Sequence, residues 1–148
     1  MGNCMSPKES SKKKEFVESK ANVETLKALY EINMKVLGSG SYGKVFLAKN
    51  KKDETIQIAI KVIKKVNMSE DDLLGLKREV AIMQQVDHPN IVKYFETYDD
   101  KKYIYLCMEL CKGGELFQKI IDNNKPMTEP EVSGEMAKLL RALQHCHS

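Results

Sequence analysis

Residues 37–45 read LGSGSYGKV, and this stretch decides which fold the sequence can adopt. Its three glycines form a G-x-G-x-x-G run, which lets a backbone approach phosphate groups closely and turn its N–H groups toward their oxygens. Taken alone, such a run is also typical of a plain glycine-rich hairpin turn or of a dinucleotide-binding turn. A dinucleotide-binding turn requires a helix directly after the last glycine. Residues 44–48 instead read KVFLA, a strand pattern, so we expect the tip of a hairpin and no Rossmann fold.

The flanking segments predict an antiparallel sheet. Segments 30–37, 43–49 and 55–64 are rich in β-branched and apolar residues and are bounded by Gly, Asn or Asp, which predicts three strands of a meander. Two further strands, 91–98 and 103–109, are joined by a turn of sequence DDKK. The glycine run therefore lies inside a five-stranded sheet.

Three helices are predicted between and after these strands. Ser69 is suited to cap a helix that opens with three acids and ends before the Asp-His-Pro at 87–89. The apolar positions of this helix recur at helical spacing: Leu73, Leu76, Val80 and Met83. A short helix is predicted near 115–121, and a long one follows a T-x-x-E capping box formed by Thr128 and Glu131. The face of the long helix that is suited to burial consists of Val132, Met136, Leu139, Leu140 and Leu143.

Length and composition limit the possible classes of protein. The chain has 148 residues, of which 42% are hydrophobic and 30% are charged, as expected for one globular domain. Its formal charge of +3 is too small to indicate a nucleic-acid partner. No apolar stretch reaches the roughly 18 residues that span a bilayer. The four cysteines are scattered and form no CxxC pair, which favours a reducing, intracellular location.

Lys61 is the first candidate for a functional side chain. It lies in the strand segment 58–62, where alternation places it on the same face as the small Ala59. Beside a glycine-rich hairpin, its ammonium group is well placed to hold phosphate oxygens. The alternative is a lysine that extends into solvent at a strand end, which suits Lys64 and Lys65 better.

Glu79 is the second candidate. It lies between Leu76 and Val80 on the apolar side of the predicted helix, where a carboxylate is costly unless it is paired. Lys61 is the natural partner for it. The alternative, an ordinary surface acid, suits the three acids at 70–72 better.

Five motifs in order now resemble a known family. The glycine run, AIK at 59–61, the helix carrying Glu79, HPNIV at 88–92 and MELCKGGEL at 108–116 resemble the N-terminal lobe and hinge of a eukaryotic protein kinase. The GGEL segment and the start of the chain resemble the calcium/calmodulin-dependent and calcium-dependent serine/threonine kinases. The resemblance covers residues 30–148.

The resemblance implies an α+β fold with three parts. Residues 26–111 would form a kinase N-lobe and hinge, in which a five-stranded antiparallel sheet is joined by one helix. Residues 112–148 would form the first helices of an incomplete, helical C-lobe. Residues 1–25, which are rich in serine and lysine, are expected to form a flexible basic tail.

The resemblance also implies an ATP site. The glycines would form a flap over the phosphates with Tyr42 at its tip, and Lys61, paired with Glu79, would hold the α- and β-phosphates. Lys61 and Glu79 are thus the implied catalytic residues. The implied ATP-binding set is Leu37, Gly38, Ser39, Gly40, Ser41, Tyr42, Gly43, Val45, Ala59, Lys61, Met108, Glu109, Cys111 and Glu115.

Within this set, the adenine contacts would come from three places. Val45 and Ala59 would cover the ring, and Met108 would guard the back of its pocket. The backbone of Glu109 and Cys111 would hydrogen-bond the adenine edge. Glu115 would reach the ribose, or an arginine ahead of the phosphorylated Ser or Thr, which implies protein substrates with basic residues near that site.

The main departure from the family is the lack of two motifs. In the family, the catalytic Asp lies in an H-R-D-x-x-x-x-N loop, and the Mg²⁺ ligands come from that loop and from a D-F-G motif. This sequence contains neither motif. We therefore expect a truncated kinase that is inactive alone and holds no metal itself, with a long helix that lacks its packing partners. The alternative is a non-catalytic, membrane-tethered binding module that uses the lobe and this helix to engage partners.

The first residues predict a membrane address. Residues 1–6 read MGNCMS, which fits a myristoylation signal at Gly2, with Cys4 available for palmitoylation. The lysines at 8 and 12–14 would add attraction to anionic lipid. We expect a cytoplasmic protein held peripherally at a membrane. The alternative is a coincidental start and a solvated basic tail.

Three other features are expected to carry no chemistry. His145 and His147 lie two apart on a helix and cannot easily share a zinc ion. Cys107 alternates into a buried strand face. His88 precedes a proline and is expected to be a packing residue.

Overall fold

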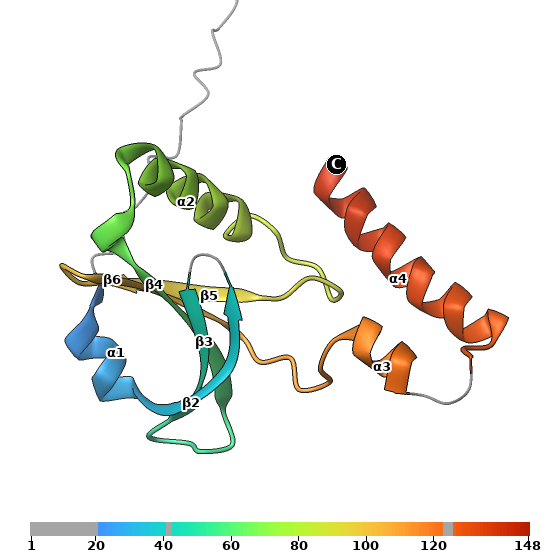
Figure 1. Ribbon diagram of the computed structural model, residues 1–148, viewed down its shortest axis with the longest axis horizontal. Coiled ribbons are helices and arrows are strands. Elements are labelled where there is room, and N and C mark those ends of the chain that lie inside the picture. Colours follow the sequence, from blue (N-terminus) through green and yellow to red (C-terminus); the bar gives the residue numbers. More distant parts are fainter. Residues whose placement is uncertain (1–20, 41–42, 123–125) are drawn as a thin grey trace, which may run out of the picture.

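The computed structural model describes residues 21–40, 43–122 and 126–148 (Figure 1). Six strands form one sheet in the order β1-β5-β6-β4-β3-β2. The strands are β1 (Ala21–Asn22), β2 (Tyr30–Gly40), β3 (Gly43–Asn50), β4 (Gln57–Lys64), β5 (Tyr94–Asp99) and β6 (Tyr103–Glu109). The helices are α1 (Val23–Leu29), α2 (Glu70–Met83), α3 (Leu116–Asp122) and α4 (Glu129–His147), with a 3₁₀ turn at Lys65–Asn67.

The predicted five-stranded antiparallel sheet is confirmed. Strands β2 to β6 pair antiparallel throughout, and β1 adds two residues parallel to β5 at its edge. The predicted fourth strand began at 91, whereas β5 begins at Tyr94. Residues 88–91 form a turn instead, because the Ile91 N–H donates to the His88 carbonyl oxygen and the Asn90 N–H donates to the His88 ring.

The two faces of the sheet are covered by different helices. On one face, which we call the outer face, Val23 and Leu26 of α1 pack in one buried cluster with Ile58 and Ile60 of β4. On the opposite face, Ile63 of β4 is buried in a cluster with Leu76 and Val80 of α2. Figure 1 shows α1 and α2 on opposite sides of the strands. Because side chains alternate along β4, Lys61 lies on the same face of the sheet as Ile63 and α2, as predicted.

The predicted boundary between tail and lobe is wrong for residues 21–25. These residues form β1 and the start of α1, and Val23 is 5% exposed. The helix begins after Asn22, whose side chain accepts a hydrogen bond from the Glu24 N–H. Because α1 is only two turns long, its apolar spacing is too brief to predict a helix reliably. Residues 1–20 lie outside the described part of the chain.

Helix α4 begins as predicted. The Glu131 carboxylate accepts hydrogen bonds from the Thr128 N–H at 2.8 Å and from the Thr128 hydroxyl at 2.9 Å. Its apolar face is suited to burial but is exposed, as expected for a helix that lacks its packing partners. The five predicted residues are each 43–58% exposed, and Figure 1 shows α4 standing apart from the sheet. Among the described residues, no helix combines the length and apolarity that crossing a bilayer requires.

Candidate functional site

The glycine run forms a hairpin, as its sequence predicts. Gly40 pairs with Gly43 at its end, and Gly38 pairs with Val45 further down. Ser41 and Tyr42, which would lie at the tip, are outside the described residues. Because a strand follows the last glycine, the structure agrees with the hairpin and not with a dinucleotide-binding turn.

The glycines of the hairpin differ in what surrounds them. A Cβ at Gly43 would collide with the carbonyl oxygen of Val62 on β4, so a close approach of two strands requires glycine there. A Cβ at Gly38 or Gly40 would meet nothing within 4 Å. Packing within the protein therefore does not require glycine at these two positions. The open space above their backbone is available to a ligand.

Lys61 occupies the centre of the sheet. It pairs with Val45 on β3 and with Leu106 on β6, while Ala59 pairs with Met108. Side chains that are directly opposite in an antiparallel pair share a face. The structure thus brings together on one face the lysine and the three residues that were expected to surround the adenine.

Lys61 and Glu79 line the same small cavity, which has a volume of about 220 Å³ between β4 and α2. The structure does not join them, however: among the described residues, no ion pair within 4.0 Å links these two side chains. The prediction that Glu79 lies on the buried stripe is also wrong, because the residue is exposed. Glu79 lies about 60° around the helix from buried Leu76, at the border of the stripe.

Two further acids line the cavity that Lys61 lines. Asp71 and Asp72 line the cavity at the N-terminal end of α2. Asp72 is committed to capping this helix, because its carboxylate accepts hydrogen bonds from the Ser69 N–H at 2.9 Å and from the Ser69 hydroxyl at 2.7 Å. These hydrogen bonds lower the pKa of the Asp72 carboxyl. Asp71 and Glu79 are thus the acids in this cavity that are not bound to the helix cap.

The segment that follows β6 is exposed from Cys111 onward. The Glu109 N–H donates to the Lys93 carbonyl oxygen at 2.8 Å, which fixes the end of the strand. Cys111 and Glu115 are exposed, and Gly114 between them has a φ of 71°, which favours glycine. Met108 is half-buried beside these residues. Of the predicted adenine-contacting positions, Met108 thus lies opposite Ala59, and Cys111 and Glu115 follow in the exposed segment after β6.

The cysteine inside the sheet is a core residue, as predicted. Cys107 is fully buried, and burial, with a smaller effect of the Glu96 charge, raises the pKa of its thiol to about 12. Such a thiol is protonated at neutral pH and is a poor nucleophile. Cys107 therefore contributes packing and no chemistry to the site.

The structure places one pair of histidines together that the sequence did not predict. The rings of His88 and His145 have centroids 5.3 Å apart, so the end of α4 approaches the turn before β5. Among the described residues, no group of three or more His, Cys, Asp and Glu could hold a metal ion. No periodicity links these histidines, which are 57 positions apart in the sequence.

Comparison with known proteins identifies a family. A family model described as "Protein kinase domain" matches residues 30–148. The chain is 45% identical over 127 residues to calcium-dependent protein kinase 5 of Plasmodium berghei, covering 86% of this chain and 22% of that protein. It is 36% identical over 135 residues to calcium/calmodulin-dependent protein kinase type 1 of Caenorhabditis briggsae, covering 91% and 37% respectively. The chain thus spans between about a fifth and two fifths of the length of these relatives.

Proposed function

Because the chain belongs to the protein kinase family, we propose that it is the ATP-binding part of a serine/threonine kinase, which transfers the γ-phosphate of ATP to protein hydroxyl groups. The observation that supports this best is the shared face of Val45, Ala59 and Lys61 beside a glycine hairpin with free space above it. A flat apolar ring fits against Val45 and Ala59. The Lys61 ammonium group then reaches the phosphates as a point charge.

We propose that the described residues hold the nucleotide and supply no ligand to its metal. The hairpin and Lys61 suit phosphate oxygens, whereas no cluster of metal-ligating side chains gathers in the described part of the site. The family's Mg²⁺ ligands belong to motifs that this sequence does not contain. We therefore assign no residue of this chain to Mg²⁺ and propose that the 148-residue chain alone binds ATP without transferring phosphate.

Glu79 has a positioning role in this proposal. It lines the cavity next to Lys61 but is not within ion-pair distance of it. The family uses a contact between this lysine and this glutamate to orient the lysine, and we propose that the two side chains pair when the nucleotide is bound. Glu79 would thereby act on the phosphates through Lys61.

A nucleotide-binding titration tests the site. Lys61→Met removes a charge-assisted contact, which is worth about 1.5–3 kcal/mol and corresponds to a loss of roughly 10- to 100-fold in ATP affinity. The matched control is Lys64→Met, because Lys64 lies on the same strand but lines the outer face. Equal ATP affinity in both variants would contradict the proposal.

One observation favours a second candidate function. The apolar face of α4 is half exposed over five residues, which suits a non-catalytic module that binds another protein through this helix. The ATP-binding part of a kinase and the binding module differ in the expected effect of Lys61→Met. A binding module would keep its partner in this variant and lose it when Leu139 and Leu143 are changed to lysine.

We also propose a membrane address and a substrate preference, both of which rest on the sequence. Myristoylation of Gly2, with Cys4 and the nearby lysines as second signals, would hold a cytoplasmic protein at an anionic membrane surface. Gly2→Ala should move the protein to the soluble fraction, and unchanged partitioning would refute the anchor.

Exposed Glu115 would favour protein substrates with basic residues, and charge reversal at Glu115 in a complete enzyme should remove that preference.

A further inference from the structure

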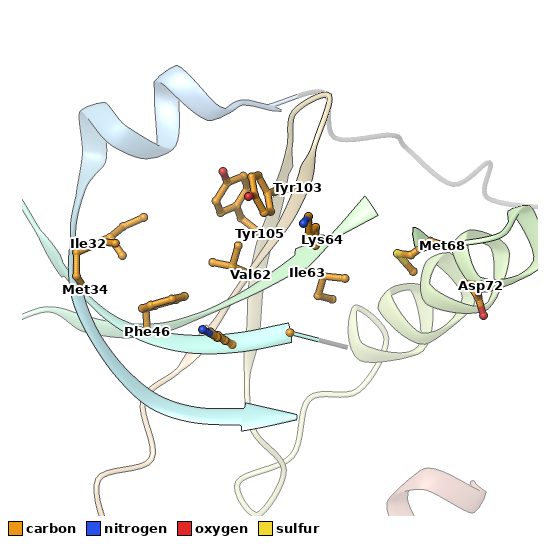
Figure 2. Close-up of a pocket in the computed structure, with 12 residues that line it drawn as sticks. Ile32, Met34, Phe46, Val62, Ile63, Lys64, Met68, Asp72, Tyr103 and Tyr105 are labelled. Carbon is orange, nitrogen blue, oxygen red and sulfur yellow. The ribbon is translucent and has the colours of Figure 1, made fainter. Parts of the chain in front are cut away.

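A groove with a volume of about 820 Å³ lies mainly on the outer face of the sheet, the face opposite Lys61. Its floor consists of Phe46, Val62 and Tyr105, which come from three neighbouring strands. Ile32 and Met34 of β2 close one side (Figure 2). We call this hollow the outer groove.

The outer groove is the part of this face that α1 leaves open. Helix α1 packs with Ile58 and Ile60 on one half of β4, whereas the groove begins at Val62 on the same strand. Figure 2 shows the lining side chains in the space between α1 and the start of α2. Met34 is 80% exposed there, so a large apolar side chain faces solvent. The groove therefore has room and apolar surface for an additional segment.

The charges of the outer groove limit what can occupy it. Lys44 and Lys64 line it, and both are exposed. The acid in its lining, Asp72, already accepts two hydrogen bonds from Ser69. An occupant with an apolar centre and flanking acids would complement this lining.

The first described residue lies close to the groove. Ala21 pairs with Tyr98, which pairs with Tyr105, and Tyr105 pairs with Val62 on the groove floor. These three steps between strands amount to about 14 Å. The chain therefore enters the sheet, at Ala21, at a short distance from the groove.

The preceding sequence contains a segment with the required chemistry. Residues 15–18 read Glu-Phe-Val-Glu, and Phe16 is the only aromatic residue before Ala21. Phe16 is five residues from Ala21, and five residues reach up to about 17 Å. We propose that Phe16 and Val17 dock in the outer groove of the same chain, with the flanking glutamates facing Lys44 and Lys64.

A single fluorophore tests this docking. The chain contains no tryptophan, so Phe16→Trp introduces one reporter at the proposed contact. The matched control is Met5→Trp, which places the reporter in the same part of the chain but sixteen residues from Ala21. We expect the tryptophan of Phe16→Trp to emit at shorter wavelength and to be quenched several-fold less by acrylamide than that of Met5→Trp. Equal emission and quenching would overturn the proposal.

Changes in the groove show where the reporter is held. Met34→Asp and Lys44→Glu alter exposed side chains of the lining, so the fold should persist in both. Combined with Phe16→Trp, either change should restore quenching to the level of Met5→Trp. A tryptophan that stays protected from acrylamide in both combinations docks elsewhere, for example on α4. Protection that appears only at high protein concentration indicates that the segment docks on a second copy of the chain. Both of these outcomes overturn the proposal, and neither affects the nucleotide site on the opposite face.

Discussion

At the scale of single residues, the site depends on which side of a strand each side chain takes. Lys61 shares a face with Val45 and Ala59 because β4 alternates and its neighbours are in register. Lys64, three residues later, lines the outer groove instead. A one-residue slip of β4 would therefore move the lysine away from the glycine hairpin and remove the site.

The two kinds of glycine in the hairpin should respond differently to alanine. Gly43→Ala should destabilise the protein by about 1–3 kcal/mol, because its Cβ would collide with the Val62 carbonyl oxygen. Gly38→Ala should leave the free energy of unfolding almost unchanged, since nothing lies within 4 Å of its Cβ. Urea unfolding of both variants measures the difference, and equal losses of stability would show that the strands do not approach as described.

Cys107 should make the protein sensitive to alkali. Burial raises its pKa from 9.0 to about 12, so the folded state holds the proton more tightly than the unfolded state. The resulting stability is fully present below about pH 9 and is lost as the pH rises toward 12. The melting temperature should fall as the pH rises from about 9 toward 12, and less so in Cys107→Val, which has no thiol to titrate. An identical fall in both proteins would remove Cys107 as the cause.

At the scale of elements, caps and alternation made most of the architecture predictable. Strand β6 has the bounds that the sequence predicts, because its alternating side chains are bounded by turn residues. Helix α1 was missed because two turns carry little periodic signal, and its burial against Tyr98 depends on contacts far away in the sequence. The exposure of Glu79 was missed for a similar reason. Its position at the border of an apolar stripe depends on where α2 sits against β4, which the sequence does not specify.

The cap of α2 should be important for the helix that carries Glu79. The Asp72 N–H donates to the Ser69 hydroxyl, and the Asp72 carboxylate accepts from the Ser69 N–H. Ser69→Ala should cost about 1 kcal/mol, whereas Ser69→Asp retains a side-chain acceptor and should cost much less. Chemical denaturation compares the two variants. A similar cost for both would mean that the cap does not stabilise α2.

At the scale of the whole molecule, the sheet with α1 and α2 forms the packed unit. The buried clusters join these two helices to the strands, whereas α4 leaves its apolar face half exposed. The sequence predicts that α4 is amphipathic but cannot predict what covers it, because the covering surface lies outside the helix itself. Stability and association should therefore depend on different parts of the chain.

Two leucine substitutions separate these parts. Leu106→Ala should cost about 2–5 kcal/mol, since Leu106 is 1% exposed within the cluster beneath α2. Leu139→Lys should leave the unfolding of the sheet unchanged and reduce self-association, because Leu139 is 56% exposed. Thermal unfolding and sedimentation measure the two effects. A large loss of stability in Leu139→Lys would mean that α4 packs onto the rest of the molecule.

The most direct test of the account is a map of the amide chemical-shift changes that ATP causes in the labelled chain. Nucleotide binding at the hairpin predicts changes at 38–40 and 43–45, at 59–61 and at 108–111, with little change at Tyr103 and Tyr105 on the outer face. Changes that centre on the outer face, or an absence of changes around Lys61, would contradict the claim that this lysine and the glycine hairpin hold the triphosphate.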